Sequence, residues 1–199
     1  MALKIVLASS NAGKVKEIQA LLADKNIEIV PQSALGIADV EENGETFHEN
    51  ALIKARHAAR LSGLPAIADD SGLEVDALNG APGVYSARYA GSKSSSDADN
   101  NRKLLSELQD IPASLRTARF RCVIVLLRDT DDPAPLVAEG SWEGSILDQG
   151  KGNCGFGYDP LFYVGERDCS AAELSGEEKN RLSHRGKALF SLLEQLDQI

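Results

Sequence analysis

Two adjacent carboxylates are the first feature of the sequence that could do chemistry. Asp69 and Asp70 follow the apolar stretch PAIA at 65–68 and precede a Ser-Gly pair. Buried ionised carboxylates repel each other unless a cation or hydrogen-bond donors compensate them. Together with Glu42 they are candidates for binding magnesium through oxygen ligands, and one of them could orient or deprotonate a water molecule. The alternative is a solvated turn with an acidic tip, and a surface acidic cluster for Glu42.

A second group lies in SSNAGK, residues 9–14, where an apolar strand-like run meets a helix-like segment. Backbone N–H groups and the positive end of a helix dipole favour an anion there. Ser9, Asn11 and Lys14 would add a hydroxyl, an amide and an ammonium group. The spacing differs from the Walker motif, so a Walker-type nucleotide site is not supported. The alternative is that Ser10 or Asn11 caps the helix and Lys14 is solvated.

The third group combines NCGFGYDP at 153–160 with EEKNRLSHRGK at 177–187. The second segment adds Lys179, His184 and Arg185. Aromatic side chains stack on bases, and His184 or Arg185 can donate to a carbonyl edge. His184 and Arg185 fall in the first turn after Ser183, where cations are unfavourable without an anion or an electron-rich base edge. An exposed helix start with solvated charges is the alternative.

The elements that must position these groups follow from periodicity. KIVLA at 4–8 predicts a buried strand, and the following residues 9–24 have helical spacing. Thr46 and Glu49 form a capping-box pattern that opens a helix to about residue 61, on which Lys54 could reach a phosphate or extend its charge to solvent. Further strands are expected at 27–30, 65–70, 72–77, 118–128, 135–146 and 158–164. Three further helices are expected: one that ends near residue 108, one that begins after Ser175 with Glu178 completing a capping box, and one that begins after Ser183. We expect an α/β fold around a long twisted mixed sheet, as one domain over 1–199.

Composition excludes several function classes. The formal net charge of −9 argues against a nucleic-acid surface, although a small polyanion could bind with a divalent cation. The longest apolar run, 122–127, is far shorter than the ~20 residues of a membrane span, and residues 1–7 lack a signal-peptide core. We therefore expect no membrane partner and a cytoplasmic protein. Cys122, Cys154 and Cys169 indicate neither a disulfide framework nor a zinc site.

Taken together, five motifs resemble those of the inosine and xanthosine triphosphate pyrophosphatase family. They are SSNAGK (9–14), ENGETFHENALIKA (42–55), ADDSGLEVDALNGAPGVYSARY (68–89), FGYDP (156–160) and EEKNRLSHRGKAL (177–189). The resemblance covers essentially the whole chain, with Ser9 standing where many members have threonine. It implies an elongated protein with a long mixed sheet, two lobes flanking a cleft, and a homodimer. It also implies magnesium-dependent hydrolysis of deaminated purine nucleoside triphosphates between the α and β phosphates, giving the monophosphate and diphosphate.

The resemblance also implies roles for individual residues. Asp70 would be the proton acceptor and, with Glu42, a Mg²⁺ ligand, while residues 9–14 and Lys54 would hold the triphosphate. The acid and lysine groups themselves motivate the hypothesis that Lys14 and Lys54 stabilise charge on the leaving diphosphate. The substrate would be held by Ser9, Ser10, Asn11, Ala12, Gly13, Lys14, Ser71, Phe156, Gly157, Tyr158, Asp159, Lys179, His184 and Arg185. Hypoxanthine and xanthine carry an oxygen that accepts from His184 or Arg185, whereas the amino group of adenine leaves those donors unpaired. Guanine has the same oxygen, so its rejection has another cause.

Two other functions are compatible with parts of this pattern. An aspartate-nucleophile phosphatase also uses paired aspartates after a strand, but it would have D-x-D near the first strand, where this chain has SSNAGK. It would also release orthophosphate through an acyl-phosphate. A nucleotide-binding regulatory module would need the phosphate and base groups but not Glu42 and Asp70 together.

Overall fold

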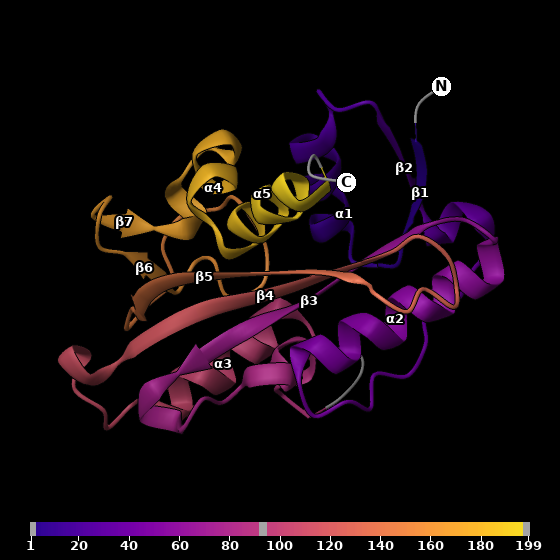
Figure 1. The fold of residues 1–199 in the computed structure, drawn as a ribbon. Coiled ribbons are helices and arrows are strands. Elements are labelled where there is room, and N and C mark those ends of the chain that lie inside the picture. The colour runs from indigo at the N-terminus through magenta and orange to yellow at the C-terminus, as the bar shows by residue number, and fades with distance from the viewer. Residues whose placement is uncertain (1–2, 92–94, 197–199) are drawn as a thin grey trace. The chain divides into compact units, whose positions relative to one another are not determined.

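The structure, a computed structural model, describes residues 3–91 and 95–196. Strands and helices alternate over most of this length (Figure 1). The strands are β1 (Leu3–Leu7), β2 (Ile27–Pro31), β3 (Ala66–Val75), β4 (Thr117–Leu127), β5 (Leu136–Ile146), β6 (Phe162–Val164) and β7 (Cys169–Ser170). The α-helices are α1 (Ala12–Leu22), α2 (Phe47–Ser62), α3 (Asp97–Glu107), α4 (Gly176–Leu182) and α5 (His184–Leu196). Short 3-10 helices span Gln32–Leu35, Asp76–Leu78, Gly83–Arg88, Ala113–Leu115 and Ala171–Glu173.

The strands form one seven-stranded sheet in the order β2-β1-β3-β4-β5-β6-β7. β1 pairs in parallel with β2 on one side and with β3 on the other. β5 and β7 both pair antiparallel with β6. The sheet is therefore mixed and flanked by helices, which confirms the predicted fold class.

The chain divides into two compact units, each with its own core. Unit 1 comprises Met1–Asp70, Cys122–Gly140 and Arg185–Ile199, and unit 2 comprises Ser71–Arg121 and Ser141–His184. β3, β4 and β5 each contribute residues to both units.

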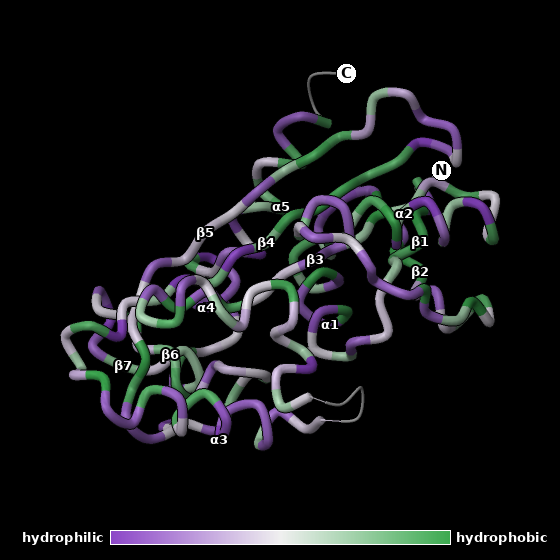
Figure 2. The backbone as a smooth tube through the Cα atoms, turned by 90° about the horizontal axis from the view of Figure 1, so that it is seen from below, coloured by the Kyte–Doolittle hydropathy of each residue, from purple (hydrophilic) through white to green (hydrophobic). Residues whose placement is uncertain are grey.

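Unit 1 is a three-layer arrangement. Figure 1 shows α2 on one side of its strands and α1 and α5 on the other. Successive strand residues serve the two layers alternately: Ile5 and Leu7 pack with α1 and α5, whereas Val6 packs with α2. In Figure 2 the tube is mostly green over β1 and changes between purple and green along α2. This is the pattern of a strand buried on both faces and of an amphipathic helix.

Unit 2 has an aromatic core. Phe120, Trp142 and Phe162 lie against one another, with the rings of Phe120 and Phe162 separated by 4.6 Å between centroids. Leu104 and Leu108, from α3 and the residue that ends it, pack into the same cluster.

Two predicted elements differ from the structure. β3 continues through Ser71 and Gly72, so the predicted break there is wrong; a strand at the middle of a sheet tolerates a Ser-Gly pair when its neighbours supply the ladder. The strand predicted at 158–164 contains only Phe162–Val164, because hydrogen bonds from the amides of Leu161 and Phe162 to the Tyr158 carbonyl form a turn before it. The capping boxes at Thr46 and Ser175 are confirmed.

Candidate active site

The carboxyl end of β1 is a topological switch point within unit 1. The connection from β1 to β2 runs through α1 on one face, and the connection from β2 to β3 runs through α2 on the other. Since β2 and β3 flank β1 in parallel, the chain leaves the centre of this parallel group in opposite directions. Ligands of open α/β sheets bind at such points. Residues 9–14, hereafter the phosphate loop, lie directly after β1.

Side chains of the phosphate loop shape its backbone. Asn11 caps α1, with its Oδ1 accepting from the Lys14 amide at 3.0 Å, and Ser9 Oγ accepts from the Asn11 amide at 3.2 Å. An α-helix supplies no internal partner for its first amides, here those of Ala12 and Gly13. Ser10 Oγ donates to Asp39 Oδ2 at 2.6 Å, a contact that the sequence did not predict. The loop thus presents amides suited to an anion.

The two adjacent aspartates lie on opposite faces of β3. Both are nearly inaccessible, with 1% of Asp69 and 6% of Asp70 exposed. Strand alternation places Asp69 with Ile67, on the α1 and α5 side, and Asp70 with Ala68, on the α2 side. The carboxylates therefore have separate sets of partners.

Asp69 is enclosed by cations. Its Oδ1 lies 2.5 Å from Lys14 Nζ, and its Oδ2 accepts from Arg185 Nε and Cys122 Sγ, each at 2.9 Å. Burial alone would raise the pKa of Asp69, but Arg185 and Lys14 outweigh it and hold this pKa well below its usual range. Asp69 is thus a permanently ionised partner for these cations, and its surroundings do not resemble those of a metal ligand.

Arg185 has a different environment from the predicted one. It is 1% exposed, and its guanidinium pairs with Asp69 and also with Glu17 of α1. Nε and Nη1 of Arg185 donate to these two carboxylates. These ion pairs hold α5, α1 and β3 together, a role invisible in sequence because Glu17 and Asp69 are distant along the chain. The contact of Arg185 with a base stays a prediction.

Asp70 is joined to Glu42 through Lys54. Lys54 Nζ lies 2.7 Å from Asp70 Oδ1 and 2.9 Å from Glu42 Oε2. Among residues 3–91 and 95–196, no donor reaches Asp70 Oδ2, which is buried. Burial raises the pKa of Asp70 to about 6, although Lys54 and Lys14 oppose the rise. Such a carboxyl group is a stronger base than an ordinary aspartate and is ionised at neutral pH.

The two neighbours of Asp70 both have pKa values shifted toward their charged forms. Burial would raise the pKa of Glu42, but the Lys54 ammonium lowers it overall. Burial would lower the pKa of Lys54, but Asp70 and Glu42 raise it. Lys54 and Glu42 therefore stay charged near neutral pH.

The donor set fits a hard divalent cation. In the described part of the chain, no cluster of three or more His, Cys, Asp or Glu residues could hold a metal by itself. Magnesium commonly uses one or two carboxylates and completes its shell with water and substrate phosphates. Asp70 Oδ2 accepts no hydrogen bond from the described residues, and Glu42 is joined to Asp70 through Lys54, so these two carboxylates match the ligand set of magnesium.

Unit 2 contains the aromatic loop, residues 155–159. Asp159 Oδ2 accepts from the Phe156 amide at 2.8 Å and from Lys179 Nζ at 2.5 Å. Lys179 Nζ also lies 4.7 Å from the centre of the Phe156 ring. Gly155 has φ +78°, and a Cβ there would lie 2.1 Å from Asp159 Oδ2, so only glycine fits. The structure thus brings together Phe156, Asp159 and Lys179, as the sequence predicted.

Other predicted substrate residues have structural contacts. Tyr158 is buried in the core and donates through its hydroxyl to the Ser86 carbonyl at 2.8 Å, which leaves Phe156 as the half-buried aromatic of the pair. His184 is buried and stacks on Phe120 at 4.8 Å between ring centroids. Ser71 is half-buried within β3.

Two contacts to the aromatic loop were missed by sequence reasoning. Asp97 and Asn101 of α3 hydrogen-bond to Gly157, which lies 60 and 56 residues away along the chain. Nothing in the local sequence signals a contact over such a separation.

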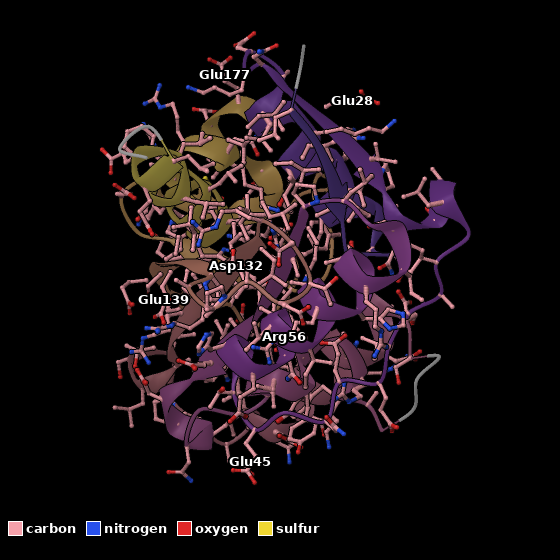
Figure 3. The ribbon with its side chains drawn as sticks, turned by 45° about the vertical axis from the view of Figure 1, so that its right-hand side comes forward. Glu28, Glu45, Arg56, Asp132, Glu139 and Glu177 are labelled. Carbon is pink, nitrogen blue, oxygen red and sulfur yellow. The ribbon has the colours of Figure 1, made fainter. Side chains whose placement is uncertain are left out.

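A cavity of about 610 Å³ in unit 1 is lined by different residues. Arg56 borders it from α2 and Asp132 from the connection between β4 and β5; both are labelled in Figure 3. Arg56 and Lys54 are two residues apart on one helix, so they project in different directions. Arg56 therefore serves as a control position for Lys54.

Comparisons with known proteins agree over nearly the full length of the chain. The profile of the Ham1 family matches residues 5–195. A protein of Thioalkalivibrio sulfidiphilus named dITP/XTP pyrophosphatase is 60% identical over 194 residues, which cover 98% of each chain. A protein of Methylococcus capsulatus with the same name is 61% identical, covering 97% of this chain and 96% of the relative.

Solved structures give the same result. The structure of a HAM1 protein from Coxiella burnetii matches with a TM-score of 0.90 at 52% identity, covering 99% of this chain and all of the other. The Ham1 protein of Staphylococcus aureus matches with a TM-score of 0.84 at 43% identity, covering 98% of both chains. The chain therefore belongs to the Ham1 family.

Proposed function

We propose that this protein hydrolyses deaminated purine nucleoside triphosphates, those of inosine, deoxyinosine and xanthosine, to the monophosphate and diphosphate. The observation that carries the proposal is Asp70, a buried carboxyl group with a pKa of about 6 and an unbonded Oδ2, at the switch point that also holds the phosphate loop. The names of the relatives, dITP/XTP pyrophosphatase, support the same substrates.

In this mechanism, water attacks the α-phosphorus while Asp70 accepts its proton. The bond between the α-phosphorus and the bridging oxygen breaks, and diphosphate leaves with the bonding electron pair. Lys14 and Lys54 stabilise the negative charge that develops on the leaving group. The amides of residues 12 and 13 bind phosphate oxygens at the start of α1.

Glu42 and Asp70 would hold a magnesium ion, which supplies charge neutralisation to the phosphates when bound. Lys54, which pairs with both carboxylates in the structure, would then be available to the phosphate oxygens. Its raised pKa keeps it cationic for this exchange.

Base recognition is assigned to unit 2. Phe156 would stack on the purine, and Lys179, held by Asp159, would face the base with a positive charge.

We further propose a cytoplasmic homodimer. Residues 3–91 and 95–196 include no helix that is both long enough and apolar enough to cross a bilayer.

Product analysis tests the proposal. Purified protein with magnesium is incubated separately with inosine, xanthosine, adenosine and guanosine triphosphates, and monophosphate, diphosphate and orthophosphate are resolved. Monophosphate and diphosphate from the first two alone support the proposed reaction. Release of orthophosphate would favour an aspartate-nucleophile phosphatase, and binding without turnover would favour a regulatory module.

A further inference from the structure

We propose that Asp97 and Asn101 of α3 are positioning residues that hold the aromatic loop in the conformation that receives the purine base. This inference rests on the proposed function, because it assigns a cause to the arrangement of Phe156. All the residues that carry it belong to unit 2.

The two side chains bind both backbone polar groups of one residue. The Gly157 amide donates to Asp97 Oδ2 at 2.6 Å, and Asn101 Nδ2 donates to the Gly157 carbonyl at 2.9 Å. Asp97 and Asn101 are four residues apart, so they lie on one face of the helix, one turn from each other. Gly157 has φ +61°, a left-handed conformation that glycine adopts without strain.

The contacts with α3 fix the residue that follows Phe156 in the chain, whereas a second contact fixes the amide of Phe156 itself. On the amino side of Gly157, the Phe156 amide is held by Asp159, which is fixed by Lys179. Lys179 in turn lies over the Phe156 ring. Loss of the α3 contacts would leave Gly157 free to sample the many conformations open to glycine, and the ring would no longer be fixed for stacking.

The first turn of α3 contains a matched control. Asp97 and Asp99 both place a negative charge at the helix amino end, where it is favourable. Asp99 uses its carboxylate in a capping box with Ser96, whereas Asp97 reaches Gly157. If the aromatic loop merely followed the stability of α3, Asp99→Ala would disturb it at least as much as Asp97→Ala.

The first measurement is hydrogen exchange of the Gly157 amide in ligand-free protein. We expect exchange to accelerate about fivefold or more in Asp97→Ala, because one net hydrogen bond is worth about that factor. Asn101→Ala should accelerate it as well. Asp99→Ala and Arg102→Ala, which alters a side chain that is 73% exposed, should leave it near the wild-type value. Asp97→Asn keeps an acceptor oxygen and should retain most of the protection.

The second measurement is steady-state hydrolysis of inosine triphosphate by the same variants. Asp97→Ala and Asn101→Ala should raise KM about five- to tenfold, with kcat within about twofold of wild type, because the loop binds the base and not the reacting phosphorus. Inactive wild-type protein would refute the proposed function. If the wild-type protein is active but Asp97→Ala and Asn101→Ala change neither the exchange rate of the Gly157 amide nor KM, the positioning role alone is refuted. Changes of equal size in Asp99→Ala would refute it as well.

Discussion

Replacing Asp70 with asparagine is expected to stabilise the metal-free protein at neutral pH. Asp70 is 6% exposed, and burial raises its pKa from 3.8 to about 6 against the opposing charges of Lys54 and Lys14. A folded-state pKa above the unfolded value means that the folded protein binds this proton more tightly. The associated stability is complete below the unfolded-state pKa and is lost as the pH rises through about 6.

The magnitude follows from the same two values. A shift of this size corresponds to about 3 kcal/mol of stability lost by pH 7.5, and about 1 kcal/mol already lost at pH 4.5. Asparagine has nearly the shape of aspartic acid and carries no charge to desolvate, so the variant escapes this loss. The ion pair with Lys54 is already included, because the pKa compares the charged with the neutral group in the presence of Lys54.

Urea unfolding in chelator, at pH 4.5 and pH 7.5, measures the effect. The free-energy advantage of Asp70→Asn over wild type should grow by about 2 kcal/mol between these pH values. Asp131→Asn, which changes an exposed aspartate of unit 1, should show no such growth. An Asp70→Asn protein that is no more stable than wild type at pH 7.5, or an advantage independent of pH, would refute the reasoning.

Three further outcomes are expected from the same geometry. Lys54→Met should lower kcat/KM about 100-fold or more, since one charge-stabilising donor contributes roughly that much, while Arg56→Ala should stay near wild type; equal losses would contradict the assigned role. Arg185→Met should destabilise the protein by about 3 kcal/mol in urea unfolding, because it leaves buried Asp69 and half-buried Glu17 with fewer cations. The acidic limb of the pH profile of kcat/KM should have its midpoint near pH 6 at low magnesium concentration. This midpoint should move to lower pH as the magnesium concentration rises, because a bound cation favours the ionised form of Asp70. A midpoint that does not change with magnesium concentration would argue against Asp70 as a metal ligand.

Much of the local structure could be predicted from short-range signals. The β-branched run KIVLA predicted β1, and the Thr46 capping box predicted the start of α2, because both signals act over a few residues. The Ser71-Gly72 pair gave a false break, since turn propensity is weak against the hydrogen bonding of a strand inside a sheet. Tertiary context decided that position.

The candidate site could be predicted only where its residues lie close in sequence or carry a recognisable motif. Lys14, Lys54 and the Asp159–Lys179 group were identified from such motifs. The partners of Arg185 could not be identified, because Glu17 is 168 residues away and occupies an otherwise ordinary helix position. Asp97 and Asn101 were missed for the same reason, and a Ser- and Asp-rich segment before a helix resembles a simple cap.

For the adjacent aspartates, the alternation of side chains along a strand predicts more than the Asp-Asp motif does. Side chains of a strand alternate between faces, so Asp69 and Asp70 could never share one solvent pocket once residues 66–75 formed a single strand. One face meets α1 and α5, whose Lys14 and Arg185 keep Asp69 ionised. The other face meets α2, from which Lys54 pairs with Asp70 and is shared with Glu42. Two identical side chains therefore acquire opposite pKa shifts from neighbouring positions. Asp69 fixes the position of a cation, whereas Asp70 remains able to accept a proton.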